Sequence, residues 1–191
     1  ALQRGVASEY PIIEGIPEIK QQASRFVKAF MDADVNPQGC IPTVGSMQAS
    51  FASLMIASQL DSRRDTVLYI DPGFPVQKLQ AQVIGVKSVS FDLAGCRGKA
   101  LEEKLETVYS AGNICAVLYS SPNNPTWMSL TQEELEIIGR LSAKYDVLVI
   151  EDMAYMTMDF RRDMGRPFEP PFQPSVSRYT DNYIILVSAS K

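Results

Sequence analysis

The sequence contains no histidine among its 191 residues, and this absence excludes several common kinds of active site. A Ser-His-Asp or Cys-His arrangement requires an imidazole base, and histidine is also the commonest protein ligand of zinc. The base or nucleophile of an active site in this chain is therefore a lysine, a tyrosine, a cysteine or a carboxylate.

The sequence also has few cysteines, no positive net charge and no long apolar run, and each of these features indicates something about the compartment or the partners of the protein. Its three cysteines, Cys40, Cys96 and Cys115, are an odd number without Cys-x-x-Cys spacing, which is typical of a reduced, cytoplasmic protein. With 18 basic and 22 acidic residues the net charge is −4, which argues against a nucleic-acid-binding surface. No apolar run approaches the ~20 residues of a membrane span. We therefore expect no nucleic acid, no membrane and no metal as partners.

Short apolar segments with strand character alternate with helical segments along the chain. This alternation predicts an α/β fold with three layers, in which helices cover both faces of a mostly parallel sheet. The length is enough for one domain with a sizeable core. The strands are expected at Thr66–Ile70, Val86–Phe91, Ile114–Tyr119, Val147–Ile150 and Tyr183–Val187.

The helices are marked by periodic apolar residues and by their start signals. Pro17 suits a first helical turn, and Thr131 with Glu134 forms a capping box. A short strand is also expected at Ile41–Val44, directly before a helix that Gly45 opens. The apolar face of that helix is expected to carry Met47, Phe51, Leu54 and Met55.

The stretch Val147–Tyr155 places two carboxylates after four apolar residues of a buried strand. In open α/β sheets, ligands bind outside the carboxyl ends of the strands, so Asp152 stands where chemistry usually takes place. Aspartate also caps turns and helices at such positions, and this stretch alone does not decide between the two roles.

Two groups of residues have the chemistry of a phosphate site. Gly45, Ser46 and Met47 stand at the amino end of a helix, where free N–H groups and the helix dipole favour an anion. Ser188 and Ser190 precede Lys191 and carry hydroxyl donors for the same anion. A glycine before a helix is often only a turn residue, so the first group alone is a weak signal.

Two other residues have the chemistry of contacts to a flat ring. Asn124 is held extended by Pro125 and presents a side-chain amide donor, although Asn-Pro pairs also form plain turns. Phe74 follows a strand and is able to stack on a ring, although a single aromatic residue is more often part of a core.

Together these segments resemble the class I/II pyridoxal-phosphate-dependent aminotransferases, which have the fold type I of the aspartate aminotransferase superfamily. Asp152–Tyr155 matches the family's Asp-x-Ala-Tyr, and Ser188–Lys191 matches its Ser-x-Ser-Lys. Ser121–Thr126 is similar to its Asn-Pro-x-Asn-Pro-Thr-Gly segment, with Asn124 as the ring-contacting residue. Glu9-Tyr10 followed by Gly15–Pro17 resembles the segment whose tyrosine reaches the neighbouring subunit. Four such motifs in the same order make a specific signal.

The resemblance implies an enzyme that moves an amino group between an amino acid and a 2-oxo acid. Pyridoxal 5′-phosphate would be its cofactor, bound as a Schiff base to Lys191, which then serves as the base at the substrate α-carbon. Asp152 would keep the pyridine nitrogen protonated, and Tyr155 would donate to the phenolic oxygen of the ring. Tyr10 would contact the cofactor phosphate of the partner subunit, which implies a homodimer.

The resemblance also implies what stands outside this sequence. Residues 1–191 are expected to be most of the cofactor-binding large domain, without the N-terminal arm, the small C-terminal domain and the arginine that binds the substrate carboxylate. Trp127 stands where the family usually has glycine, which implies a different turn or a narrower site.

Three other functions compete with an aminotransferase. The same fold and cofactor support lyases, decarboxylases and synthases, and aminotransferase-like domains also occur as non-catalytic parts of transcription regulators. A Mg²⁺-dependent phosphoryl-transfer site could use Glu151 and Asp152, but the sequence lacks the Gly-x-x-x-x-Gly-Lys-Ser/Thr loop of that class.

Overall fold

The computed structural model describes residues 10, 12–156, 158 and 166–190. The chain divides into two compact units, one formed by Ala1–Thr43 with Gly165–Phe172 and the other by Val44–Met164 with Gln173–Lys191. No helix within the described residues is long and apolar enough to cross a membrane.

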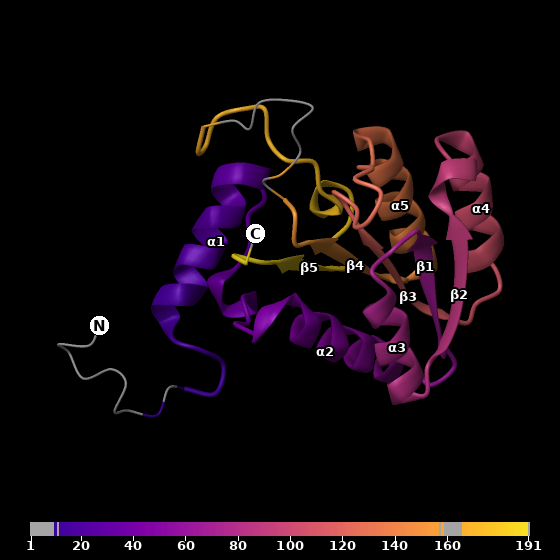
Figure 1. Cartoon of the computed structure of the whole chain (residues 1–191), viewed down its shortest axis with the longest axis horizontal. Helices are drawn as coiled ribbons and strands as arrows, with labels where there is room; N and C mark the ends of the chain where they lie inside the picture. Colours follow the sequence, from indigo (N-terminus) through magenta and orange to yellow (C-terminus); the bar gives the residue numbers. More distant parts are fainter. Residues whose placement is uncertain (1–9, 11, 157, 159–165, 191) are drawn as a thin grey trace. The chain divides into compact units, whose positions relative to one another are not determined.

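The smaller unit is built around helix α1 (Pro17–Met31), drawn in indigo in Figure 1. The helix begins at a proline, as the sequence predicts, and ends at Asp32, whose φ is 55° and whose N–H donates to the Lys28 carbonyl. The N–H of Phe168 donates to the Ala29 carbonyl over 2.8 Å, which attaches the second segment of this unit to the helix.

The prediction of a short strand at Ile41–Val44 is wrong. These residues form no strand, and the Ile41 and Val44 side chains are exposed. Pro42 has no N–H for a ladder, and a strand is stable only where it has a partner. Val44 instead precedes helix α2 (Gly45–Leu60).

The larger unit contains one sheet of five parallel strands, in the order β2-β1-β3-β4-β5. Its strands lie within one or two residues of the segments predicted from the sequence, except that β4 continues three residues further. The strands are β1 (Thr66–Asp71), β2 (Lys87–Asp92), β3 (Ile114–Ser120), β4 (Leu148–Met153) and β5 (Tyr183–Val187).

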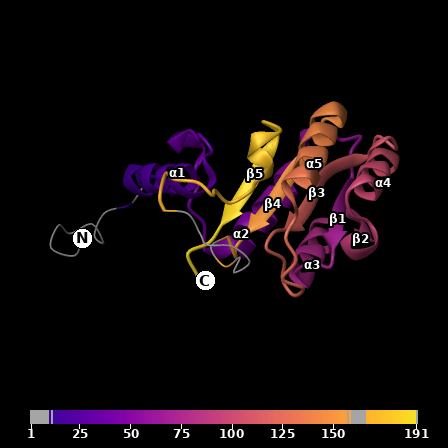
Figure 2. The ribbon, with the colours of Figure 1, turned by 90° about the horizontal axis from the view of Figure 1, so that it is seen from above.

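Helices cover both faces of this sheet, which confirms the predicted three-layer α/β fold. Helices α4 (Lys99–Tyr109) and α5 (Gln132–Tyr145) pack on one face, through a core that includes Leu105, Ile138 and Val117. Helices α2 and α3 (Pro75–Ile84) pack on the other face, through a core that includes Leu54 and Ala81. Figure 1 and Figure 2 show the two helix pairs on opposite sides of the strands.

The buried side of α2 differs from the predicted one. Of the four residues expected on its inner face, only Leu54 is fully buried, while Met47 and Met55 are 50% and 38% exposed. The helix instead packs through Ser50, Ser53, Leu54 and Ala57. Small side chains let a helix approach a sheet closely, and a helix that is apolar on all sides has no periodic signal to mark its inner face.

The strand order reverses direction beside β1. The chain runs from β1 outward to β2 and then crosses back to β3, on the other side of β1. The loops after β1 and β3 therefore diverge at the carboxyl edge of the sheet, and ligands of open α/β sheets bind at such a reversal.

Candidate functional site

Asp152 lies near the carboxyl end of β4, in register with Ser120 of β3 and Leu186 of β5. Its side chain is only 7% exposed. One carboxylate oxygen, Oδ1, accepts the Ala154 N–H over 3.1 Å, and the other, Oδ2, accepts the side-chain amide of Gln77 over 2.7 Å. Asp152 thus caps the turn after the strand, as one interpretation of the sequence predicts, and also presents a buried carboxylate at this edge.

Two opposing effects act on the pKa of Asp152. Burial raises it, while the hydrogen bonds from Ala154 and Gln77 lower it, and the net direction is upward. A buried carboxylate with a raised pKa gains from a cationic partner, because the partner replaces the lost solvation of the charged form. The arrangement therefore suits a cationic group placed beside Asp152.

Gln77 is a residue of this site that no sequence motif marks. This residue lies in the first turns of α3 and is buried together with Ala81, one helical turn further on. The sequence does carry one signal, because Gln77 precedes the apolar Ala81 by four residues and so shares its helix face. A glutamine on an inner face is buried, and a buried amide needs a partner in the core.

Tyr155 and Asn124 meet across the turn after β4 and the loop after β3. The Asn124 amide donates to the Tyr155 hydroxyl oxygen over 3.3 Å, and both residues are half-buried. The hydrogen of that hydroxyl is consequently directed away from Asn124. The two residues that the resemblance implies as contacts of one flat ring are thus brought together by the fold.

Asn123 fixes the loop that carries Asn124. Its side-chain amide donates to the Pro72 carbonyl after β1 and, over 3.1 Å, to the Ser120 hydroxyl. Its side-chain oxygen accepts from the N–H and the hydroxyl of Thr126. Asn123 therefore joins the loops after β1 and β3 where the strand order reverses.

Trp127 completes the same turn with an unusual backbone. Its φ is 62°, in the left-handed region that suits glycine, and a non-glycine residue there costs about 1–2 kcal/mol. The ring lies edge-to-face on Tyr155, with 5.5 Å between the centroids and 69° between the planes. The turn therefore keeps a backbone conformation that suits glycine, and the indole lies against the side chain of Tyr155.

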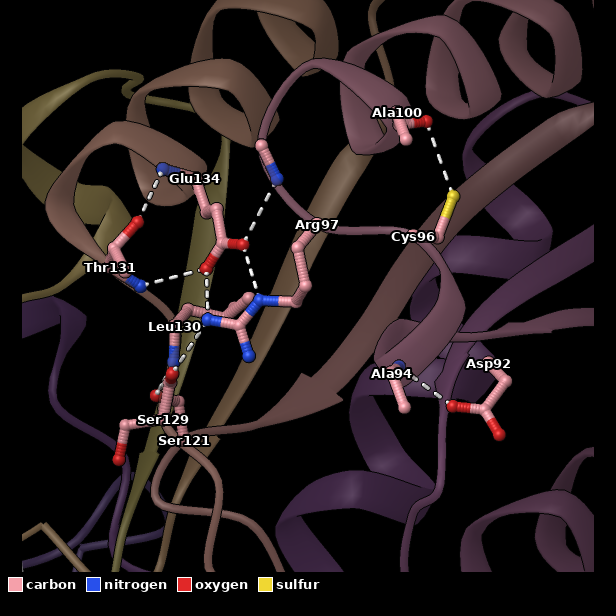
Figure 3. A network of polar contacts seen from close by, with 11 residues as sticks. Asp92, Ala94, Cys96, Arg97, Ala100, Ser121, Ser129, Leu130, Thr131 and Glu134 are labelled. Atoms are coloured by element: carbon pink, nitrogen blue, oxygen red, sulfur yellow. Dashed lines mark hydrogen bonds and ion pairs between the residues drawn. The ribbon is translucent and has the colours of Figure 1, made fainter.

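A polar network fixes the far end of this loop, as Figure 3 shows. The Ser121 hydroxyl accepts the Leu130 N–H over 3.1 Å, and Thr131 and Glu134 form the predicted capping box at the start of α5. The Arg97 guanidinium donates to both Glu134 oxygens and to the Ser129 carbonyl. The loop that presents Asn124 is thus held at both ends.

The candidate phosphate residues lie at the start of α2 and after β5. Gly45 has a φ of 74°, and a Cβ built on it would meet no atom within 4 Å, so open space adjoins the first turn of α2. Ser46 is half-buried and Met47 is exposed. Ser188 and Ser190 share a hydrogen bond of 2.8 Å between their hydroxyls. The first-turn amides of a helix lack carbonyl partners within it, which suits an anion.

Three further residues were predicted for the site: Phe74, Tyr10 and Lys191. Phe74 is half-buried and immediately precedes α3, three residues before Gln77. The aromatic ring of Phe74 and the Gln77 amide that donates to Asp152 are therefore both carried by the start of α3. Tyr10 belongs to the smaller unit and its side chain is fully exposed. Lys191 lies outside the described residues.

Glu151 belongs to the other face of the sheet. Its fully buried carboxylate accepts from the Tyr119 hydroxyl, the Ser175 hydroxyl and the Val176 N–H. Successive residues of a strand point to opposite faces, so Glu151 and Asp152 do not form a joint carboxylate site. The alternative of a Mg²⁺ site that uses both residues is therefore wrong.

Comparisons with known proteins agree with this geometry. The family described as aminotransferase class I and II matches residues 1–191. Glutamate-pyruvate aminotransferase AlaC of Escherichia coli is 31% identical over 156 residues, which cover 80% of this chain and 37% of that protein. Asparagine–oxo-acid transaminase of Streptococcus mutans is 27% identical over 175 residues, which cover 91% of this chain and 44% of that protein. The chain thus spans less than half the length of these relatives.

Solved structures share the fold. A tetra mutant of aspartate aminotransferase from Thermus thermophilus superposes with a TM-score of 0.76 at 23% identity, over 99% of this chain and 50% of that one. An aminotransferase from Neisseria meningitidis has a TM-score of 0.76 at 19% identity, over 96% of this chain and 46% of that one.

Proposed function

We propose, since the chain belongs to the class I and II aminotransferases, that it forms the cofactor-binding part of an enzyme that moves an amino group between an amino acid and a 2-oxo acid. The observation that carries this proposal is the buried Asp152 carboxylate at the carboxyl edge of the sheet, with the Tyr155–Asn124 pair in the adjoining loops. Residues 1–191 would then be most of the large domain of the enzyme.

The residues of this site fit pyridoxal 5′-phosphate, the cofactor of the family. A protonated pyridine nitrogen suits Asp152, whose raised pKa reflects a carboxylate short of solvation. The hydroxyl of Tyr155 and the amide of Asn124 suit the phenolic oxygen, and Phe74 suits the face of the ring. The open space at Gly45 and the hydroxyls of Ser46, Ser188 and Ser190 suit a phosphate.

When bound, the cofactor supplies an electron sink for the bond that breaks at the substrate α-carbon. Asp152 holds a proton at the ring nitrogen by remaining ionised beside it. Tyr155 donates a hydrogen bond to the phenolic oxygen, and Asn124 fixes the position of that hydroxyl. Lys191 would hold the cofactor covalently through its amine, and once the substrate amine has displaced it the freed lysine amine would accept the proton of the α-carbon.

The proposed enzyme is a homodimer in which Tyr10 reaches the cofactor phosphate of the partner subunit. The exposed apolar side chains of α2 support such an interface, because exposed apolar residues grouped on one helix are typical of surfaces that a partner covers. These residues are Met47, Met55, Ile56 and Leu60. We also infer a cytoplasmic location, supported by three free cysteines, one of them buried.

The complete protein, loaded with pyridoxal 5′-phosphate, tests the proposed activity. We expect a visible absorbance band, and borohydride should fix the cofactor on the peptide that contains Lys191. An amino acid and a 2-oxo acid should exchange an amino group without release of CO₂. A covalent adduct on another lysine in the Lys191→Ala protein, or CO₂ release with each turnover, would contradict the proposal.

A mixed dimer tests the role of Tyr10. One hydrogen bond to a phosphate is worth about 1–3 kcal/mol, so Tyr10→Phe should weaken cofactor binding by roughly ten- to a hundredfold. In a dimer of one Tyr10→Phe subunit and one Lys191→Ala subunit, the site with an intact lysine receives an intact Tyr10 from its partner. That site should bind cofactor at wild-type strength, and binding as weak as in the Tyr10→Phe homodimer would show that the contact does not exist.

A further inference from the structure

Trp127 is the single tryptophan of the sequence, and its indole packs on a residue of the proposed site. It lies edge-to-face on the Tyr155 ring and is 40% exposed. The Tyr155 hydroxyl, in turn, accepts a hydrogen bond from the Asn124 amide. Tyr155 is therefore contacted at its ring and at its oxygen by two residues of one short turn.

The turn itself does not require an indole. It is closed by main-chain bonds from the Trp127 N–H to the Asn123 carbonyl over 2.9 Å, and from the Asn123 N–H to the Met128 carbonyl over 2.8 Å. Glycine would make the same bonds and adopt a φ of 62° without strain. A strained residue next to a functional group calls for a role of its side chain.

We propose that Trp127 is a positioning residue for Tyr155, which fixes the phenol ring so that its hydroxyl stays at Asn124. The proposal rests on the proposed function, in which that hydroxyl donates to the phenolic oxygen of the cofactor. A half-buried tyrosine turns readily about its side-chain bonds, and an edge-to-face partner restricts those turns. Trp127 thereby strengthens a donor that it does not itself supply.

The pH dependence of the cofactor spectrum reports this donor. A loosely held hydroxyl leaves more negative charge on the phenolic oxygen, which favours the protonated form of the bound cofactor. In Trp127→Gly the pH midpoint of the visible absorbance change should therefore rise, by about one unit or less. Trp127→Phe keeps an aromatic edge on Tyr155 and should restore most of the wild-type midpoint.

A matched control separates this effect from the relief of backbone strain. Phe168 is another aromatic residue at positive φ, 69°, and it belongs to the smaller unit. Phe168→Gly should leave the absorbance midpoint unchanged. Thermal unfolding of the Trp127→Gly protein without cofactor should remain cooperative, so that a shift of the midpoint does not reflect an unfolded chain.

The outcomes for Trp127 and for the proposed function are distinct. A wild-type protein that binds pyridoxal 5′-phosphate with a visible band, and a Trp127→Gly protein with the same midpoint, would overturn the positioning role alone. A wild-type protein that develops no such band would overturn the proposed function and this inference with it. A raised midpoint in Trp127→Gly that Trp127→Phe reverses is the result that supports the inference.

Discussion

The side-chain amide of Gln77 donates to Asp152 Oδ2 over 2.7 Å, between α3 and β4, and both residues are buried. An amide carries no charge, so it stabilises the ionised carboxylate without neutralising it. In the proposed function, that charge would pair with a protonated ring nitrogen of the cofactor. Gln77 thus favours the ionised form of a carboxylate whose pKa burial raises.

Gln77→Leu removes this donor and should make the ionised form of Asp152 less stable. A hydrogen bond to a charged group contributes about 1.5–3 kcal/mol, so the free energy of unfolding at pH 7 should fall by about that amount. The loss should shrink towards about pH 3, where the carboxyl is largely protonated in the folded and the unfolded protein. Urea titrations at both pH values measure it, and Gln82→Leu on the exposed side of α3 is the control. Equal losses at both pH values would show that Gln77 acts by packing alone.

Asp152→Asn preserves the shape of the side chain and removes its charge. The proposed half-reaction should slow by roughly 10²- to 10⁴-fold, because the proton at the ring nitrogen loses its ionised partner. The free energy of unfolding should not fall, since the buried charge itself is unfavourable. Single-turnover absorbance with several amino acids, together with urea unfolding, checks both statements.

Asp92 provides a matched control for this substitution. Its carboxylate lies at the end of β2 and accepts the Ala94 N–H, as Asp152 accepts the Ala154 N–H. Asp92→Asn should leave the half-reaction unchanged. If Asp152→Asn reacts at the wild-type rate as well, Asp152 is only a turn cap and the electron-sink role is wrong.

The Arg97–Glu134 pair should stabilise the loop that carries Asn124 (Figure 3). Burial raises the pKa of Glu134, but the bonds from Arg97, Thr131 and Gly98 outweigh it and the net direction is downward. A lowered folded pKa means that the stabilisation is present above the pKa of the unfolded carboxyl and is lost as the pH falls through the folded value. Arg97→Met should therefore reduce the free energy of unfolding by about 1–3 kcal/mol at pH 7, and by progressively less as the pH falls below 4.5.

Lys99→Met is the control for Arg97→Met. The ammonium of Lys99 pairs with Glu103 at 3.8 Å on an exposed surface of α4, where such pairs contribute about 0.5 kcal/mol or less. Unfolding monitored by circular dichroism compares the two variants. An Arg97→Met protein as stable as Lys99→Met at pH 7 would contradict a stabilising role of the Arg97–Glu134 pair.

Periodicity and strand-end rules located most of the fold because they depend on local patterns. The helix start expected at Pro17 and the capping box at Thr131 agree with the structure, and β4 places Asp152 at the edge where ligands bind. The strand-end rule also predicted Asn124 and Tyr155 at the same edge, because parallel strands align their carboxyl ends.

Features that depend on distant contacts were not predictable in the same way. The Gln77–Asp152 bond joins residues 75 positions apart, and no local pattern encodes such a pair. Ile41–Val44 has the apolar character of a strand but no neighbour to pair with. The apolar residues of α2 surround the helix, so only packing against the sheet decides that Ala57 is buried and Met47 exposed.

Glu151 should make stability depend on pH through a group outside the proposed site. Burial raises the pKa of this carboxyl from 4.5 to about 7, although the Ser175, Val176 and Tyr119 donors act against the rise. The folded protein therefore binds more protons than the unfolded one between those two values. The free energy of unfolding should fall by at most about 3 kcal/mol as the pH rises through this window. Above the window it should stay level.

Glu151→Gln removes the titration and keeps an oxygen that accepts from Ser175 and Val176, while its new amide donates to the Tyr119 oxygen. Urea unfolding at pH 5 and pH 8 should show the variant more stable than the wild type at pH 8 and close to it at pH 5. The exposed Glu136→Gln on α5 should follow the wild type at both values. Because Glu151 faces away from Asp152, cofactor affinity should not change in the variant. A Glu151→Gln protein that loses stability equally at pH 5 and pH 8 would show that its carboxylate is a fixed hydrogen-bond acceptor and does not titrate in this range.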